Sequence, residues 1–262
     1  MIDLHNHMLP GLDDGAVDWE ESLAMARLAV RDGIRGVVCT PHWLRGAYET
    51  SRSVVLEKAA LLREKLQDRK IPLEIYPGSE LRLDTALLNK IKSREILTLN
   101  DNGRYALLEL PPVVISEHVE RFLWELCSQG ITPILGHPER NFFLQRQPTK
   151  LANWIKRGAL VQITGASLLG HFGRSAQEFA QLLIEHHMVH VLATDAHGMQ
   201  NRPPVLSAAH HLAEQIMGKE YAARLVCETP KCIVQGVPVP TEAPLPLDNR
   251  ASVWRKLVSF WK

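Results

Sequence analysis

Residues 18–42 read DWEESLAMARLAVRDGIRGVVCTPH and contain one complete unit of a pattern that recurs along the chain. Asp18 is a typical helix N-cap, and Glu21 three residues later is typical of a capping box. Apolar residues then recur at helical spacing until Gly33, which favours a helix end. The apolar run 34–39 that follows predicts a short buried strand. This stretch therefore predicts a helix followed by a strand, which is the unit of an α/β fold.

Further strand and helix candidates alternate on both sides of this unit. Short runs rich in Val, Ile and Leu predict strands at residues 2–6, 34–39, 73–79, 105–110, 131–136, 159–164 and 189–194. Segments of helical period predict helices near residues 18–32, 50–69, 84–93, 116–129, 149–157, 174–187 and 203–217. Seven strand-then-helix units favour parallel strands joined by helical crossovers, and thus one α/β barrel slightly short of eight strands. An open doubly wound sheet is the alternative.

The composition is that of an ordinary globular protein. The chain has 262 residues, 45% hydrophobic and 23% charged, which is enough to bury a sizeable core. A formal net charge of +1 gives no general attraction for nucleic acid, so we expect no nucleic-acid partner. The first residues lack the basic and apolar regions that are typical of a signal peptide, no apolar run approaches about 18 residues, and the four cysteines show no zinc-finger or disulfide-framework spacing. We therefore expect a soluble, cytoplasmic protein with reduced thiols.

The composition changes after Gly236. Residues 236–250, GVPVPTEAPLPLDNR, contain four prolines and predict an extended linker after a domain that spans residues 1–235. The tail 251–262 has Trp254, Leu257, Val258 and Trp261 at helical spacing among basic residues. One hypothesis is a basic amphipathic helix with weak contact to a membrane surface. The alternative, which we favour, is packing on its own barrel or on a neighbouring subunit.

Side chains that can bind metal ions fall where the predicted strands end. They are His5, His7, His42, Glu80, Glu109, His137, Asp195 and His197, with Asp14 in the loop after the first strand. The C-terminal ends of barrel strands meet on one face, and the imidazoles of a His-x-His pair point to the same side of a strand. Nitrogen and oxygen ligands without thiolate suit Mn²⁺, Fe²⁺ or Zn²⁺. Nine ligands exceed the needs of one ion, so we expect two or three.

Such a cluster of ions favours phosphate chemistry. Neighbouring divalent cations can clamp a phosphoryl group and generate hydroxide near neutral pH. The sequence therefore predicts a metal-dependent phosphoesterase that uses a metal-activated hydroxide and has no protein nucleophile.

Two other patterns resemble functional motifs, and we expect both to be coincidental. Cys39 and Arg45 have the Cys-x5-Arg spacing of cysteine-dependent phosphatases, but the loop contains no glycine and Pro41 removes a backbone N–H group that this chemistry needs. His186 and His190 have the i, i+4 spacing of a helical metal pair, but no Glu follows His186 as in zinc proteases.

Several motifs together resemble a known superfamily. They are DLHNH and LPGLDDG within residues 3–15, TPH at 40–42, GSELR at 78–82, GHPERN at 136–141 and TDAH at 194–197. They are similar to those of the polymerase and histidinol phosphatase (PHP) superfamily. More narrowly, they resemble its bacterial manganese-dependent protein-tyrosine phosphatases from capsule and exopolysaccharide loci. The resemblance covers residues 1–235.

The resemblance implies a single-domain, distorted (β/α)7 TIM-like barrel with a three-metal site. By motif, the first ion would be held by His5, His7, Glu80 and Asp195; the second by Glu80 as a bridge, Glu109 and His137; and the third by Asp14, His42 and His197. Manganese is the expected metal, with iron, zinc or cobalt as alternatives. The resemblance also implies that Arg140 and Arg202 hold the substrate phosphate. The planar fork of arginine independently suits this role, because it can pair with two phosphate oxygens.

The resemblance further implies a phosphotyrosine protein as substrate. The expected partner is the tyrosine-rich tail of a membrane-associated tyrosine kinase of polysaccharide biosynthesis, which would place the enzyme at the inner face of the cell membrane. One alternative is a phosphatase of a small phosphomonoester such as histidinol phosphate, because metals recognise phosphate rather than the group that carries it. The second alternative is a non-catalytic interaction module with the same fold.

Overall fold

The computed structural model describes residues 1–111 and 117–247, and ten strands lie in this part of the chain. Their bounds are β1 Ile2–Asn6, β2 Gly36–Cys39, β3 His42–Leu44, β4 Tyr48–Glu49, β5 Glu74–Pro77, β6 Glu80–Arg82, β7 Tyr105–Glu109, β8 Thr132–Gly136, β9 Leu160–Thr164 and β10 Val191–Ala193. All of them pair in parallel except β4, which forms an antiparallel hairpin with β3.

Two of the predicted strands bend and continue as a second strand. β2 stops before Pro41 and β3 continues beyond it, while β5 stops before Gly78 and β6 continues beyond it. Proline has no N–H group with which to extend the β-ladder. At Gly78 a Cβ atom would lie 2.9 Å from the Val38 side chain, so a larger residue would not fit at this bend. The sequence pattern predicts only the first half of each bent strand.

The strands close into a barrel. The order β1-β2-β5 forms one sheet and β10-β9-β8-β7-β6-β3-β4 the other, and the two bent strands run from one sheet into the other. The remaining gap is closed by a parallel bridge between Asn6 and Ala196 and by the N–H group of Asp195, which donates to the carbonyl oxygen of His5 at 2.8 Å. The predicted (β/α)7 barrel is therefore confirmed, and the open doubly wound sheet is excluded.

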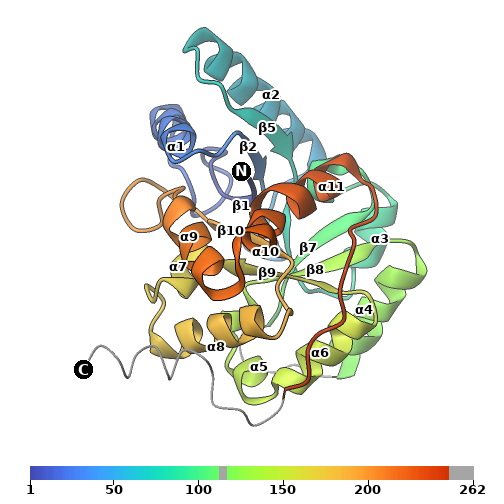
Figure 1. Cartoon of the computed structure of the whole chain (residues 1–262). Coiled ribbons are helices and arrows are strands. Elements are labelled where there is room, and N and C mark those ends of the chain that lie inside the picture. Colours follow the sequence, from blue (N-terminus) through green and yellow to red (C-terminus); the bar gives the residue numbers. More distant parts are fainter. Residues whose placement is uncertain (112–116, 248–262) are drawn as a thin grey trace.

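Helices cover the outside of the barrel (Figure 1). The α-helices are α1 Trp19–Arg31, α2 Arg52–Asp68, α3 Leu87–Lys92, α4 Glu117–Ser128, α5 Phe142–Arg146, α6 Pro148–Lys156, α7 Gly165–Leu168, α8 Arg174–Glu185, α9 Ser207–Met217, α10 Lys219–Ala223 and α11 Thr229–Gln235. Two 3₁₀ turns, η1 Leu99–Asp101 and η2 Pro138–Arg140, and a π-helical turn, η3 Arg224–Glu228, complete the set. All seven predicted helices are present, with slightly different ends. The prediction left residues 218–235 unassigned, and they form α10, η3 and α11.

The first helix shows how local sequence sets an element's bounds. The side chain of Asp18 accepts a hydrogen bond from the N–H group of Glu21 at 2.9 Å, as the N-cap prediction requires. The Glu21 carboxylate binds the N–H group of Val17 at 3.0 Å and that of Met199 at 3.4 Å. Glu21 therefore connects the start of α1 to the loop that follows β10.

Two apolar cores lie on the two sides of the barrel wall. The larger core packs the outer faces of the strands against the helices. The smaller core fills the barrel interior and joins the first residues of β7 and β9, Tyr105 and Leu160, to Ile233 of α11. Helix α11 therefore closes the N-terminal end of the barrel. Polar side chains, among them His5 and Gln162, are buried closer to the C-terminal end, where barrel enzymes place their active sites.

The Pro-rich segment after α11 lies along the barrel. Residues 237–247 are extended and contain neither helix nor strand (Figure 1). The hydroxyl group of Tyr105 donates to the carbonyl oxygen of Val237 at 2.6 Å, and Glu242 pairs with Arg224 at 2.6 Å. The segment thus makes specific contacts with the barrel as far as it is described. The last residues of the predicted linker and the predicted tail 251–262 lie outside the described residues.

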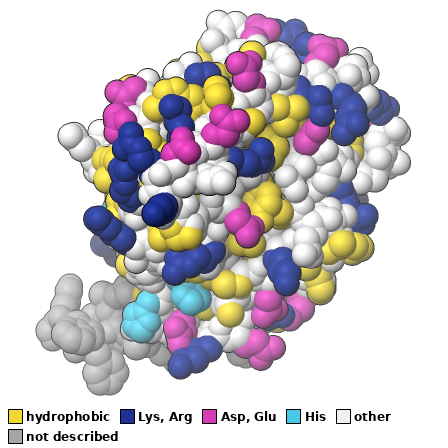
Figure 2. All heavy atoms as spheres, turned by 90° about the horizontal axis from the view of Figure 1, so that it is seen from above, with side chains coloured by type: hydrophobic (Ala, Val, Ile, Leu, Met, Phe, Trp, Pro, Cys, Tyr) yellow, Lys and Arg dark blue, Asp and Glu magenta, His cyan; other side chains and the backbone are white. Residues whose placement is uncertain are grey.

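Within the described ranges, no helix is both long and apolar enough to cross a membrane. The face in Figure 2 carries basic and acidic side chains mixed with small apolar areas. This mixture differs from the continuous basic surface that is typical of nucleic-acid binding.

Candidate metal centre and active site

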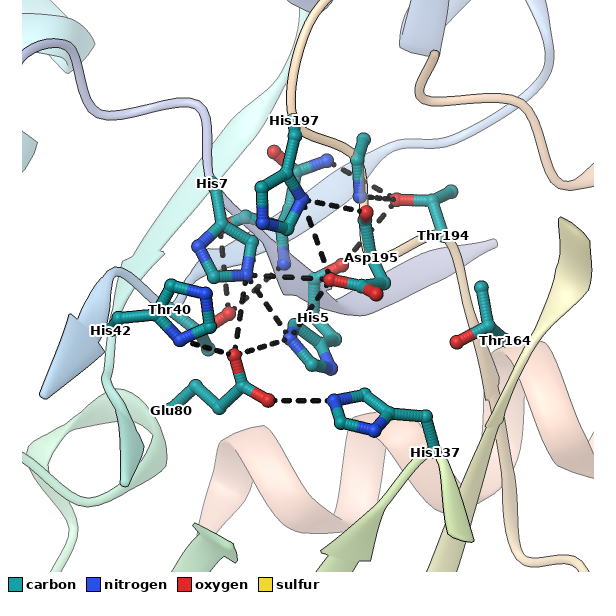
Figure 3. A network of polar contacts seen from close by, with 12 residues as sticks. His5, His7, Thr40, His42, Glu80, His137, Thr164, Thr194, Asp195 and His197 are labelled. Carbon is teal, nitrogen blue, oxygen red and sulfur yellow. Dashed lines mark hydrogen bonds and ion pairs between the residues drawn. The ribbon is translucent and has the colours of Figure 1, made fainter. Parts of the chain in front are cut away.

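Nine side chains meet at the C-terminal end of the barrel. They are His5 and His7 at the end of β1, Asp14 in the next loop, His42 on β3, Glu80 on β6, Glu109 on β7, His137 after β8, and Asp195 and His197 after β10. Figure 3 shows most of these side chains pointing toward one another. The structure therefore brings together all nine residues that the sequence pattern predicts as metal ligands.

A pair of buried imidazoles forms the centre of the cluster. The Nε2 atoms of His5 and His7 lie 3.1 Å apart. Glu80 Oε2 lies 3.2 Å from the first of these nitrogens and 3.5 Å from the second. Asp195 Oδ1 lies 3.3 and 3.4 Å from the same two atoms. Two imidazoles and two carboxylates that converge in this way form a donor set typical of a divalent transition metal.

The remaining ligand candidates lie on two sides of this centre. On one side, His137 Nε2 is 2.8 Å from Glu80 Oε1. On the other, Asp14 Oδ1 is 3.4 Å from His42 Nε2 and 3.5 Å from His197 Nε2. Four overlapping groups have ligand atoms within 4.8 Å of one another: His7, Asp14, His42 and His197; His5, His7 and Glu80; His5, His137 and Asp195; and His42, Glu80 and Glu109. These four groups share members with the three ligand sets that the resemblance implies, but the residues are grouped differently.

Two buried atoms of the cluster support a fit to cations. Glu80 Oε2 and His197 Nε2 make no hydrogen bond of acceptable geometry with the described residues. A buried polar atom without a hydrogen-bond partner is costly, and the lone pairs of both atoms can coordinate a cation. The residues present therefore fit divalent metal ions.

The two central imidazoles are oriented by side chains that the sequence analysis missed. His7 Nδ1 lies 2.6 Å from Asp13 Oδ2, and His5 Nδ1 lies 2.9 Å from Gln162 Oε1. These contacts place a proton on Nδ1 and leave Nε2 available for a metal, which is the usual role of such partners. Gln162 could have been found as the single amide among the apolar residues of the strand LVQIT. Asp13 could not be distinguished from its neighbour Asp14 by residue type.

Two of the ligand candidates lie at strained backbone positions. His137 has φ +34° and Asp195 has φ +52°, so both are in the left-handed region that residues other than glycine rarely adopt. His137 directly follows β8, and Asp195 follows β10 after one intervening residue. Such strain costs on the order of 1–3 kcal/mol and is concentrated at functional sites. The strained turns are therefore consistent with a functional role for this end of the barrel.

The charges of the cluster control its protonation. Burial opposes ionisation of Glu80, but the positive charge of His5 and its neighbours outweighs burial and holds the pKa of Glu80 well below its ordinary value. Burial also opposes protonation of His7, but hydrogen bonds to Asp13 and Asp195 raise the pKa of His7 to about 10. The free protein thus binds protons where cations would bind. Metal binding must release these protons and is favoured by higher pH.

Arg140 and Arg202 both face the cluster. Arg140 Nη1 lies 2.7 Å from Asp195 Oδ2, its Nη2 donates to Thr164 Oγ1 at 2.5 Å, and its Nε donates to Ser167 Oγ at 3.3 Å. Arg202 Nη1 lies 3.2 Å from the same Asp195 oxygen. Arg140 also borders a cavity of about 160 Å³ beside Glu109 and His137, and Arg202 borders one of about 330 Å³ beside Asp14 and His197. Each guanidinium group therefore lies between the cluster and a space open to a ligand.

The two coincidental patterns have structural explanations. Cys39 is fully buried on β2, and burial raises the pKa of its thiol, which prevents a reactive thiolate. Arg45 pairs with Asp84 at 2.8 Å. His190 is buried before β10, where its Nδ1 accepts a hydrogen bond from the N–H group of Val161 at 3.1 Å. These residues serve the fold rather than the cluster.

Comparisons with known proteins agree with this geometry. A family model described as capsular polysaccharide synthesis, CpsB/CapC, matches residues 1–235. The tyrosine-protein phosphatase YwqE of Bacillus subtilis is 35% identical over 250 residues, which are 95% of this chain and 98% of that protein. The putative tyrosine-protein phosphatase CapC of Staphylococcus aureus is 34% identical over 79% of this chain and 80% of its own length.

A solved structure gives the same result in three dimensions. It is described among structures of YwqE from Bacillus subtilis and CpsB from Streptococcus pneumoniae, unique metal-dependent tyrosine phosphatases. It superposes with a TM-score of 0.90 and 34% identity, over 95% of this chain and 100% of the solved chain.

Proposed function

The chain belongs to the capsular polysaccharide synthesis family CpsB/CapC, and on this basis we propose that it is a metal-dependent protein-tyrosine phosphatase. The family that the motifs indicated is thereby confirmed. The observation that carries the proposal is the convergence of five imidazoles and four carboxylates beside two arginines at the C-terminal end of the barrel. This set combines metal ligands with phosphate-binding groups in one place.

We propose that three divalent cations occupy the ligand sets that the motifs imply, with manganese as the preferred metal. When bound, the cations would polarise the phosphoryl group and supply hydroxide at neutral pH. Nine ligand candidates in four overlapping groups exceed the needs of one ion, which supports an assignment of several ions.

Arg140 is proposed to bind the substrate phosphate. A guanidinium group has five N–H donors, and Asp195, Thr164 and Ser167 engage one on each of its three nitrogens. Each terminal nitrogen keeps one N–H group for a phosphate oxygen, which permits a bidentate contact. Arg202 approaches the same carboxylate from a second loop and would neutralise a further part of the phosphate charge.

The proposed substrate is a phosphotyrosine protein of polysaccharide biosynthesis. The finer proposal is the tyrosine-rich tail of a membrane-associated tyrosine kinase, with the enzyme in the cytoplasm at the inner face of the membrane. The description of the family as capsular polysaccharide synthesis and the names of its tyrosine phosphatases support this choice.

The test compares substrates and metal states. EDTA should abolish hydrolysis of p-nitrophenyl phosphate, Mn²⁺ should restore it, and Asp195→Ala should lower turnover by on the order of 10²-fold or more. A phosphotyrosine peptide should be a better substrate than histidinol phosphate in side-by-side kinetics. Preference for histidinol phosphate would support the small-molecule alternative. A purified protein that binds no metal and lacks activity would support the non-catalytic module.

A further inference from the structure

An aromatic side chain lies directly on the proposed phosphate-binding arginine. Phe172 belongs to the loop 169–173 between α7 and α8, which we call the Phe172 loop. The guanidinium carbon of Arg140 lies 3.8 Å from the centre of the Phe172 ring. Despite this contact, 37% of the surface of Phe172 is exposed. One part of the residue therefore contacts Arg140, and another part is open to a ligand.

The Phe172 loop is held in place by its own backbone. Gly170 has φ +89° and Gly173 has φ +88°, and the N–H group of Gly173 donates to the carbonyl oxygen of Gly170 at 3.1 Å. The N–H group of His171 donates to the carbonyl oxygen of Ala166 at 2.9 Å, and a Cβ atom at Gly170 would lie 3.1 Å from the side chain of Gln177. These turns require glycine and leave Phe172 in a defined position.

Arg140 and Phe172 form one preorganised unit. Arg140 is fixed through its three nitrogens by contacts with β9, α7 and Asp195, so its planar face can rest on the ring while its edge faces the cluster. A phosphate on that edge would place the group it carries close to Phe172, because only the ester oxygen separates phosphorus from the next carbon. The position of the ring is thus linked to the position of the phosphate.

We propose that Phe172 is a specificity-determining residue whose ring forms a wall for the phenyl ring of phosphotyrosine. This inference rests on the proposed function and deepens it by naming the group that distinguishes aryl from alkyl phosphates. Aromatic pairs contribute about 0.5–1.5 kcal/mol beyond the burial of their area. An alkyl phosphate such as phosphoserine or histidinol phosphate has no ring attached to its ester oxygen and would gain little from this wall.

The test measures binding to the manganese-loaded, full-length enzyme by isothermal titration calorimetry. The probes are benzylphosphonate, which keeps one atom between phosphorus and the ring, and methylphosphonate, which has the same charged group without a ring. Phe172→Ala should weaken benzylphosphonate about tenfold and methylphosphonate by less than about twofold. Phe172→Tyr, which keeps the ring, should bind both probes like the parent. With a phosphotyrosine peptide as substrate, Phe172→Ala should change KM by a similar factor, rather than kcat.

Phe142 provides a matched control, because it is 70% exposed on the neighbouring helix α5. Phe142→Ala should not reproduce the selective loss. Equal weakening of both probes in Phe172→Ala would overturn the proposal, since Phe172 would then only support Arg140. Equal affinity of the parent enzyme for both probes would overturn it as well. Failure of the proposed function would appear separately, as a parent enzyme without metal-dependent turnover, and the two titrations would still decide whether the wall exists.

Discussion

Asp13 shows how one residue can organise a metal site without being a ligand. Its Oδ2 atom lies 2.6 Å from His7 Nδ1 and accepts a hydrogen bond from the N–H group of His42 at 2.9 Å. Its Oδ1 atom accepts from the N–H group of Gly15 at 3.0 Å. A Cβ atom at Gly15 would lie 2.1 Å from the carbonyl oxygen of His7, so this loop can approach β1 only with glycine here. Asp13 thus connects two ligand-bearing segments and fixes one imidazole.

We expect Asp13→Asn to lower the affinity for Mn²⁺ by about 10–100-fold. An amide has one acceptor oxygen, so it cannot replace the contacts that both carboxylate oxygens make. The measurement is equilibrium dialysis of metal-stripped protein against Mn²⁺. Asp18→Asn, which changes a carboxylate on the same loop but keeps an N-cap residue, is the control. Unchanged affinity in Asp13→Asn would show that His7 does not need this partner.

At the scale of elements, β10 depends on a neutral histidine. The N–H group of His190 donates to the carbonyl oxygen of Val161 at 2.9 Å, and its Nδ1 atom accepts from the N–H group of Val161 at 3.1 Å. Burial lowers the pKa of His190 to about 4. The side chain therefore continues the pairing between β9 and β10 only in its neutral form.

This pairing predicts a pH dependence of stability. Below the unfolded pKa of about 6.5 the unfolded chain binds a proton that the folded protein excludes, so the free energy of unfolding falls as the pH falls toward 4. Between pH 7 and pH 5, the free energy of unfolding of the parent should fall by roughly 2 kcal/mol more than that of His190→Asn. The amide oxygen of the variant can accept the same hydrogen bond. Urea denaturation at the two pH values measures the difference. Parallel losses in the two proteins would mean that His190 is protonated in the folded state.

At the scale of the whole molecule, the cluster joins the first and the last strand of the barrel. His5 and His7 come from the first strand, whereas Asp195 and His197 follow the last strand, and β1 closes on that same segment. Cations bound to these groups would cross-link the seam at which the barrel closes. The same ligands are far apart in the unfolded chain, so metal should bind the folded state selectively.

Metal removal should therefore lower thermal stability as well as activity. At a free Mn²⁺ concentration about 100 times the Kd, one site contributes about 2.7 kcal/mol, which corresponds to a Tm increase on the order of 5–10 °C. Circular dichroism melts of EDTA-treated protein with and without added Mn²⁺ measure this shift. Asp195→Ala should lose most of it. An identical Tm with and without Mn²⁺ in the parent would contradict a cross-linking role.

Local patterns were sufficient for a large part of the fold and of the cluster. Strand and helix periods located all seven barrel strands and seven of the helices, and Asp18 and Gly33 marked the ends of α1. The residue types at the strand ends identified eight of the nine side chains that meet in the structure, and the ninth, Asp14, lies in the loop after the first strand. This was possible because a parallel barrel places every strand end on one face, so position along the chain predicts position in space.

Contacts between distant segments decided the rest. The adjacent carboxylates of Asp13 and Asp14 are equivalent by residue type. The fold of their loop turns Asp13 toward His7, and only the closed barrel brings His197, which follows the last strand, to Asp14. Phe172 reaches Arg140 because two separate loops meet there, and α11 closes the barrel although no element was predicted for residues 218–235. Periodicity reports which face of an element is buried, whereas these contacts depend on how elements far apart in the chain pack against one another.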